Sequence, residues 1–224
     1  YREPEISSTT WQVKRAKFFT LNLSKPLLKN DRIHVLRCSF GIMSLCFMIL
    51  LFKQLSKTIW QVDTLDVGQG LATLIVKNGK GILYDTGPAW QGGNMAELEI
   101  LPYLHREGIT LEKLILSHDD NDHAGGASTI LKAYPNVEFI TPSRKNYGEN
   151  HRTFCTAGRD WDWQGLHFQI LSPHFIVERA DNAHSCVILV DDGKHSVLLT
   201  GDAEIKNEQT FARSLGKIDV LQVG

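Results

Sequence analysis

Hydrophobic and polar positions divide the chain into a polar start, one apolar run and a long region of short alternating segments. Residues 1–34 are polar and basic and follow neither a helical nor a strand period. An uncharged apolar run extends from Cys38 to Phe52. From Ile59 onward, short apolar or alternating runs end in turns that contain Gly or Asp, which is typical of β-strands. We therefore expect a basic polar segment (1–34), a hydrophobic segment with its flank (35–57) and a folded domain (58–224).

The apolar run predicts a transmembrane helix over residues 35–52. It is shorter than the roughly 20 residues of a comfortable span, but Arg37 and Lys53 can extend their charged ends toward the interface. A signal peptide and a buried core helix are the alternatives, although no small-residue cleavage site follows the run. Because more basic residues precede the run than follow it, the domain after Ile59 is expected outside the cytoplasm.

Periodicity in the domain predicts strands with a few helices between them. Leu98, Leu101 and Leu104 follow helical spacing, and Pro102 marks a kink or a late helix start. Two further helices are expected over residues 127–133 and 204–215. Short strands with few helices indicate sheets packed on each other and covered by helices, rather than a regular alternation of strand and helix.

The charge balance leaves the partner of this domain open. Lys and Arg number 24 against 25 Asp and Glu, so the formal net charge is −1. The net charge therefore gives the chain no overall positive potential that would indicate nucleic-acid binding. Attraction for DNA would have to come from a local group of basic residues or from bound metal. Arg144, Lys145 and Arg152 form a local basic cluster near Tyr147, which is either a weak platform for a strand or an ordinary solvated loop.

The densest chemistry lies in SHDDNDHAGG, residues 117–126, directly after the apolar strand KLILS. Imidazole and carboxylate groups suit divalent metals such as zinc and manganese. His118, Asp120, Asp122 and His123 together exceed what one ion takes from a single loop, so two ions are expected. An acidic turn that caps the following helix is the alternative, but it explains only one or two of these residues.

This loop resembles the metal loop of the metallo-β-lactamase superfamily, H-x-D-x-D-H followed by A-G-G. Asp120, where many members carry histidine, is typical of the ComEC branch of DNA-uptake and competence proteins. Further resemblances follow in order along the chain: LDVGQGLATLIV (65–76), LYDTG (83–87), LPYLHREGI (101–109), NAHSCVILV (182–190) and LLTGDAE (198–204). The resemblance covers residues 59–224.

The resemblance implies an α/β fold, an αββα sandwich in a bacterial inner-membrane protein whose other parts form a DNA channel. It also implies a His-His-Gly-Ser loop after Gly224, so the domain is expected to be incomplete at its C-terminus. The implied activity is metal-dependent hydrolysis of DNA phosphodiesters during natural transformation. A hydrolase of the same fold with another substrate and a non-catalytic domain that guides DNA remain the alternatives.

By matching position, the resemblance assigns individual roles in the site. His118, Asp120, Asp122 and His123 would bind metal, Asp202 would bridge two ions, and Asp122 would also orient the attacking water. Asp85 would orient the metal loop from behind, and Asn182 and Ser185 occupy the position of a further family motif. The neighbouring His184 is a spare ligand only as a secondary possibility.

Cys155 and Cys186 are either two reduced thiols or one disulfide, and composition does not decide between them. If the domain faces an oxidising compartment, a disulfide can persist there. Cys155 precedes an expected turn over residues 157–165, and Cys186 begins the strand CVILV. We therefore expect neighbouring strands to bring the two residues together as a disulfide.

Overall fold

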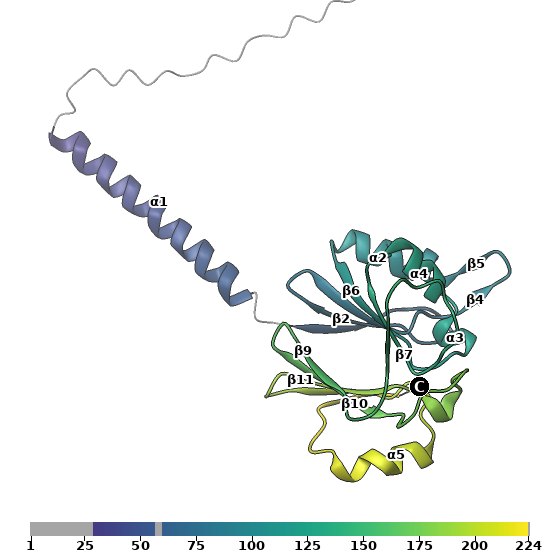
Figure 1. Cartoon of the computed structure of the whole chain (residues 1–224). Helices are drawn as coiled ribbons and strands as arrows, with labels where there is room; N and C mark the ends of the chain where they lie inside the picture. Colours follow the sequence, from purple (N-terminus) through teal and green to yellow (C-terminus); the bar gives the residue numbers. More distant parts are fainter. Residues whose placement is uncertain (1–28, 57–59, 224) are drawn as a thin grey trace, which may run out of the picture. The chain divides into compact units, whose positions relative to one another are not determined.

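The computed structural model describes residues 29–56 and 60–223 (Figure 1). The chain divides into two compact units, one ending at Lys53 and the other beginning at Gln54. Helix α1 (Lys29–Ser56) forms across the predicted apolar run. Most of the expected polar segment, residues 1–28, lies outside the described residues.

The expected membrane span is not supported by the part of the chain that the structure describes. Within residues 29–56 and 60–223, no helix combines the length and the apolar character needed to cross a bilayer. The described apolar side chains of α1, among them Phe40, Phe47 and Leu50, are exposed.

The domain is built on a six-stranded and a five-stranded sheet. The first sheet has the order β1-β2-β3-β6-β7-β8, and its β1–β2 and β2–β3 pairs are antiparallel while the others are parallel. Its strands are β1 (Gln61–Thr64), β2 (Thr73–Lys77), β3 (Lys80–Tyr84), β6 (Thr110–Ile115), β7 (Glu138–Thr141) and β8 (Arg152–Phe154). A separate small hairpin consists of β4 (Ala89–Trp90) and β5 (Gly93–Asn94).

The second sheet has the order β13-β12-β11-β10-β9 and is antiparallel except for the β12–β13 pair. Its strands are β9 (Asp160–Trp163), β10 (Leu166–Ser172), β11 (Val187–Asp191), β12 (Ser196–Leu199) and β13 (Val220–Gln222). The segment 157–165 was expected to be a turn, and that expectation is wrong for most of it. Its Asp-Trp-Asp-Trp run pairs with β10 as β9, and Gln164 and Gly165 take positive φ angles of 52° and 79° in the tight turn between them.

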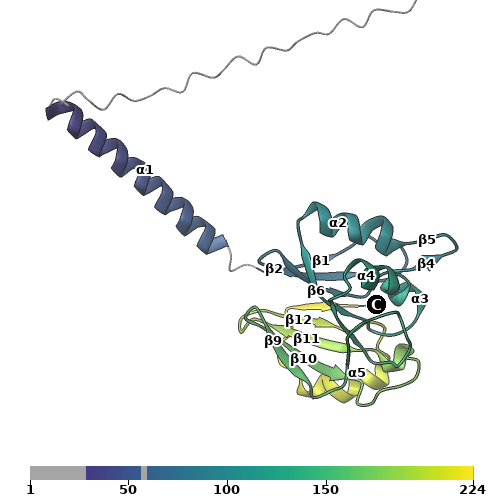
Figure 2. The same ribbon diagram turned by 45° about the horizontal axis from the view of Figure 1, so that its top comes forward.

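Helices cover the outer faces of both sheets, which gives four layers (Figures 1 and 2). Over the first sheet lie the π-helical segment η1, α2 and α4, and the short α3 follows β6. Over the second lies α5, continued by η3; the remaining short turn is η2. Their bounds are η1 (Ala96–Ile100), α2 (Leu101–Arg106), α3 (Asn121–Ala124), α4 (Ala127–Ala133), η2 (Asn182–His184), α5 (Ile205–Phe211) and η3 (Ala212–Ser214). The helix expected at 127–133 is confirmed. Pro102 lies in the first turn of α2, directly after η1, so it follows the change from π-helix to α-helix and a late helix start is wrong.

Alternating side chains of the central strands fill two different cores. In β2, Leu74 packs with the helix-covered core, whereas Ile75 packs between the sheets. Both are fully buried, because both faces of this strand are covered. A third cluster that includes Leu198 and Phe211 holds α5 on the second sheet. The expected architecture of sheets packed on each other and covered by helices is therefore confirmed.

Candidate metal centre

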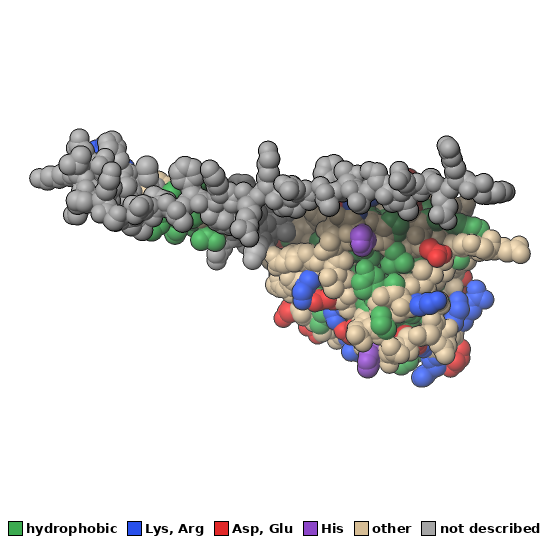
Figure 3. All heavy atoms as spheres, turned by 90° about the horizontal axis from the view of Figure 1, so that it is seen from above, with side chains coloured by type: hydrophobic (Ala, Val, Ile, Leu, Met, Phe, Trp, Pro, Cys, Tyr) green, Lys and Arg blue, Asp and Glu red, His purple; other side chains and the backbone are tan. Residues whose placement is uncertain are grey.

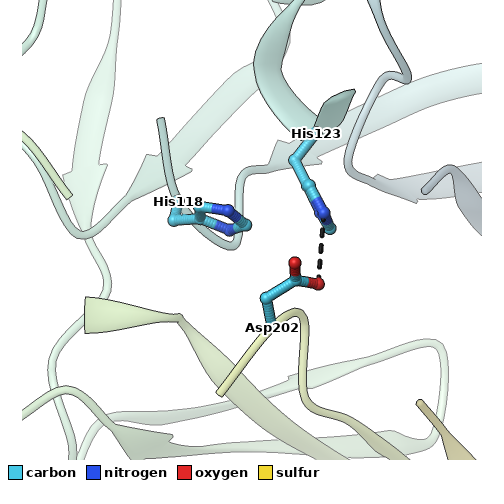
Figure 4. A group of neighbouring side chains, drawn as sticks. All are labelled: His118, His123 and Asp202. Atoms are coloured by element: carbon cyan, nitrogen blue, oxygen red, sulfur yellow. Dashed lines mark ion pairs between the residues drawn. The ribbon is translucent and has the colours of Figure 1, made fainter. Parts of the chain in front are cut away.

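The loop after β6 and the turn after β12 bring three potential metal ligands together. His118 and His123 come from the loop, and Asp202 comes from the other sheet, so each sheet contributes to the cluster (Figure 4). One ligand atom from each residue lies within 4.8 Å of the others. His123 Nε2 is 3.2 Å from Asp202 Oδ1. These three residues form the centre of the site.

Two further carboxylates predicted as ligands lie at the edge of this cluster. Asp120 Oδ2 is 3.7 Å from His118 Nε2, and Asp122 Oδ2 is 3.8 Å from His123 Nε2. Both carboxylates are partly exposed, whereas the two imidazoles are buried. All five residues predicted as ligands therefore lie in one site, with the carboxylates on its solvent side.

Asp85 supports the loop from behind. It follows β3 and is fully buried with a φ of 63°, a left-handed conformation that is unusual for a residue other than glycine. Its Oδ1 accepts a hydrogen bond from the Ser117 backbone N–H (2.7 Å), and its Oδ2 accepts one from the Ser117 hydroxyl (2.6 Å). The same Oδ2 lies 2.8 Å from His123 Nδ1. When Nδ1 donates that hydrogen bond, Nε2 is left free to bind a metal.

Close backbone approach delivers Asp202 to the loop. Gly201 has a φ of +54°, and a Cβ at this position would lie 2.5 Å from Ser117 Cβ. Gly70 is packed in a similar way against the other end of the loop, where an added Cβ would lie 2.2 Å from the Asp122 carbonyl oxygen. Glycine at both positions lets neighbouring turns close on the metal loop.

Burial and negative charge shift two proton equilibria at the centre. Burial lowers the pKa of His123, but the hydrogen bond and charge of Asp85, with the charges of Asp202 and Asp122, overcome it and raise the pKa to about 9. Burial, followed by the charges of Asp85 and Asp202, raises the pKa of Tyr84 well above its usual value of 10.0. Tyr84 therefore stays a neutral donor, and its hydroxyl donates to the Cys186 carbonyl at 2.8 Å.

The donor atoms fit a divalent cation. His118 Nε2 is buried and has no hydrogen-bond partner among the described residues, which costs about 1–3 kcal/mol. Asp202 Oδ1 is also buried, and it lies 3.2 Å from His123 Nε2. A metal cation at the centre would satisfy His118 Nε2 and replace the proton of His123 beside Asp202, and the mixed imidazole and carboxylate set suits zinc or manganese. The arrangement of these side chains is therefore best suited to binding a divalent metal ion.

The segment predicted as a further family motif lies beside the loop. Asn182 lies in η2, and Ser185 is fully buried with a hydroxyl that finds no hydrogen-bond partner within the described part of the chain. The next backbone N–H, that of Cys186, donates to the Ser117 carbonyl at 2.8 Å. His184 pairs through Nδ1 with Asp181 and is not among the three clustered ligands.

Asp119 is the functional-site residue that the sequence did not single out. It is 2% exposed, and its carboxylate accepts hydrogen bonds from Ser143, Tyr147 and the Ala180 backbone. Its only sequence signal is a position between two ligand candidates. Tyr147 is buried, so the expectation that its ring offers a platform for a strand is wrong.

Cys155 and Cys186 are joined by a disulfide between the two sheets. Their Cα atoms are 5.9 Å apart, within the range of about 4.4–6.8 Å that a disulfide tolerates. Both residues are fully buried in the core between the sheets. The bond therefore ties the residue after β8 in one sheet to the residue before β11 in the other, and the Cys186 N–H also donates to the Ser117 carbonyl of the metal loop.

Known proteins resemble most of this domain. Residues 65–223 match the family described as the metallo-beta-lactamase superfamily. The chain is 88% identical to Recombination protein 2 of Haemophilus influenzae over 224 residues, which are all of this chain and 28% of that protein. It is 35% identical over 161 residues to Competence protein ComA of Neisseria gonorrhoeae, covering 71% of this chain and 21% of that one. The chain thus spans less than a third of these two relatives.

A solved structure supports the fold independently. A metallo-beta-lactamase-like protein from Thermotoga maritima superimposes with a TM-score of 0.50 at 13% identity, over 73% of this chain and 95% of that one. At such low identity, the likeness concerns the fold alone.

Proposed function

Because the chain belongs to the metallo-β-lactamase superfamily, we propose that it is a metal-dependent hydrolase that cleaves DNA phosphodiester bonds during DNA uptake. The observation that carries the hydrolase is the convergence of His118, His123 and Asp202, with a buried His118 Nε2 that has no hydrogen-bond partner among the described residues. The names of the competence relatives support DNA as the substrate.

We assign two divalent ions, zinc or manganese, to His118, Asp120, Asp122, His123 and Asp202. When bound, such ions polarise a phosphate oxygen and lower the pKa of water. Asp85 holds the His123 ring so that its Nε2 faces the centre. Asp122 is partly exposed beside His123, so its carboxylate is available to orient an attacking water and accept its proton.

The substrate is tested by offering the chain two chemical classes in parallel. Single-stranded DNA and small carboxylic esters are incubated separately with the protein in manganese and in zinc, with EDTA as the control. Metal-dependent cleavage of DNA alone supports the proposal. Cleavage of the esters with intact DNA would assign the site to another hydrolase of this fold.

We further propose that the domain works at the bacterial inner membrane, on its outer face. The competence relatives support a role in DNA uptake, and the Cys155–Cys186 disulfide suits an oxidising compartment. Fusions of a cytoplasmic and a periplasmic reporter after Gly224 test this. An active cytoplasmic fusion with a silent periplasmic one would contradict it. Partners there would be DNA and the other parts of the uptake channel.

A further inference from the structure

A polar cavity adjoins the metal loop. Its volume is about 390 Å³, and its lining includes Asn121, Ser128, Lys145, Asn146 and Arg179. Asn121 belongs to the metal loop itself, and Arg179 Nη2 lies 3.3 Å from Asp120 Oδ1. The cavity therefore lies next to the metal centre, from which Asn121 and the Arg179–Asp120 ion pair separate it by one residue.

Asp119 fixes the two segments that supply the cations of this cavity. Its Oδ1 accepts hydrogen bonds from the hydroxyls of Ser143 (2.9 Å) and Tyr147 (2.7 Å), on either side of Lys145. Its Oδ2 accepts one from the Ala180 backbone N–H (2.7 Å), next to Arg179. The negative charge of Asp119 is thus used in holding the walls, and it does not have to be met by a ligand.

The two segments are also tied to each other. The Arg144 backbone N–H donates to the Val177 carbonyl at 2.9 Å, and the Val177 N–H donates to the Pro142 carbonyl at 3.1 Å. Burial and then the hydrogen bond to Asp119 raise the pKa of Tyr147, so its hydroxyl remains a donor. The walls that carry Lys145 and Arg179 are therefore held in a fixed arrangement.

Most cations in and around the cavity are already paired with carboxylates, including Arg179 with Asp120 at 3.3 Å, whereas Lys145 is open to a ligand. Arg152 is ion-paired with Glu149 and Arg144 with Glu178. Among the ion pairs of the described residues, Lys145 has no carboxylate partner; its Nζ lies 3.4 Å from the Asp119 carbonyl oxygen. Within the described part of the chain, Lys145 therefore supplies an unpaired positive charge at the cavity. On the visible part of the domain surface in Figure 3, both signs of charge are interspersed.

We propose that this cavity binds a phosphate group of a nucleic-acid strand, held by Lys145 and Arg179 while a neighbouring phosphodiester lies at the metal centre. The inference rests on the proposed function, because it names how the same site holds its substrate. Tyr147 is only 8% exposed, and its ring packs edge-on against Phe139, so it offers no face to a base. Recognition through phosphate is independent of base sequence.

Binding without turnover tests the cavity separately from the reaction. The probe is a fluorescein-labelled strand of deoxythymidine about 12 nucleotides long, within the range of single-strand site sizes. It is titrated with the 224-residue chain in EDTA, and anisotropy is followed at several salt concentrations. The Lys145→Gln/Arg179→Gln double variant is compared with Lys132→Gln/Arg213→Gln, which removes two exposed cations outside the cavity lining. Thermal unfolding checks that both variants are folded.

The cavity variant is expected to bind roughly tenfold more weakly, while the control variant binds as the wild type does. The slope of log affinity against log salt should fall by about 0.7 in the double variant, because the one phosphate of the cavity is no longer neutralised. Equal affinities and slopes for the two variants would overturn the inference. So would a wild-type chain that binds anionic phosphatidylglycerol vesicles but not the strand.

Hydrolysis measured on the same variants separates the two proposals. If the wild type cleaves no DNA but the cavity variant alone loses binding, the phosphate site stands and the proposed activity fails. If the wild type cleaves DNA and the cavity variant has an unchanged KM, the activity stands and the phosphate site fails. If both proposals hold, the cavity variant has a raised KM.

Discussion

Replacing Asp85 with asparagine tests whether this carboxylate prepares the metal centre. The substitution keeps the shape of the side chain and an oxygen that can still accept from the Ser117 N–H. It places an NH₂ group where Asp85 Oδ2 now meets the Ser117 hydroxyl at 2.6 Å and His123 Nδ1 at 2.8 Å. An amide N–H directed at Nδ1 favours the tautomer protonated on Nε2, which blocks the metal-binding nitrogen.

The size of the effect follows from these hydrogen bonds. The variant gives up two charge-assisted hydrogen bonds, each worth about 1.5–3 kcal/mol, but a fully buried negative charge is removed at the same time. The net change in unfolding free energy without metal is therefore expected to be smaller than the loss in metal affinity. Losing such a supporting partner typically weakens metal binding by about 10- to 100-fold, or about 1.4–2.7 kcal/mol.

Competition with a chelating dye measures the zinc affinity of each variant. Asp63→Asn is the matched control, because Asp63 accepts hydrogen bonds from Tyr103 and Gln61 on β1 and not from the metal loop. Thermal unfolding in EDTA shows whether Asp85→Asn remains folded. A folded Asp85→Asn protein that binds zinc as tightly as Asp63→Asn would refute the reasoning.

Three further predictions concern the turn, the disulfide and the proton balance. Gly201→Ala should weaken zinc binding at least as much as Asp85→Asn, since its Cβ would meet Ser117. Gly193→Ala is the control, because Gly193 has a φ of +84° but open space around it, and it should leave the zinc affinity unchanged in the same assay. Cys155→Ser/Cys186→Ser should lower the unfolding free energy by about 3–4 kcal/mol for a sequence separation of 31, and thiol labelling of the unreduced, denatured wild type should find neither cysteine free. Because the pKa of His123 is raised from 6.5 to about 9, this histidine is protonated near pH 7 in the metal-free protein. Zinc binding should therefore release its proton. Calorimetry in buffers of different ionisation enthalpy should show that the proton release decreases above pH 9. The same shift stabilises the metal-free fold fully below pH 6.5 and is lost as the pH rises through 9, so unfolding in EDTA should become easier across that window.

The layered fold could be predicted because its strands are buried in patterns that the sequence displays. Leu74 and Ile75 in β2 are both apolar, and such a run is expected where helices cover one face and a second sheet the other. The strand β9 was missed, because Trp161 and Trp163 alternate with exposed Asp residues in a segment bounded by glycines. Only pairing with β10 distinguishes that pattern from a loop.

The candidate ligands could be found from sequence because they are clustered in one loop, and Asp202 through resemblance alone. The role of Asp119 could not, because its partners Ser143, Tyr147 and Ala180 are 24 to 61 residues away. The same is true of Arg179, which reaches Asp120 across 59 residues. Long-range hydrogen bonds of single polar residues leave no periodic trace in a sequence.

Cleavage of a labelled DNA strand by the wild type and by Asp120→Ala and Asp202→Ala tests the central claim most directly. Each variant removes one carboxylate from the proposed metal centre, and circular dichroism confirms that it is folded. The wild type should cleave the strand in manganese or zinc and lose that activity in EDTA, and each variant should be inactive in either metal. Full activity in the Asp120→Ala/Asp202→Ala double variant would contradict the assignment of this site as the catalytic metal centre.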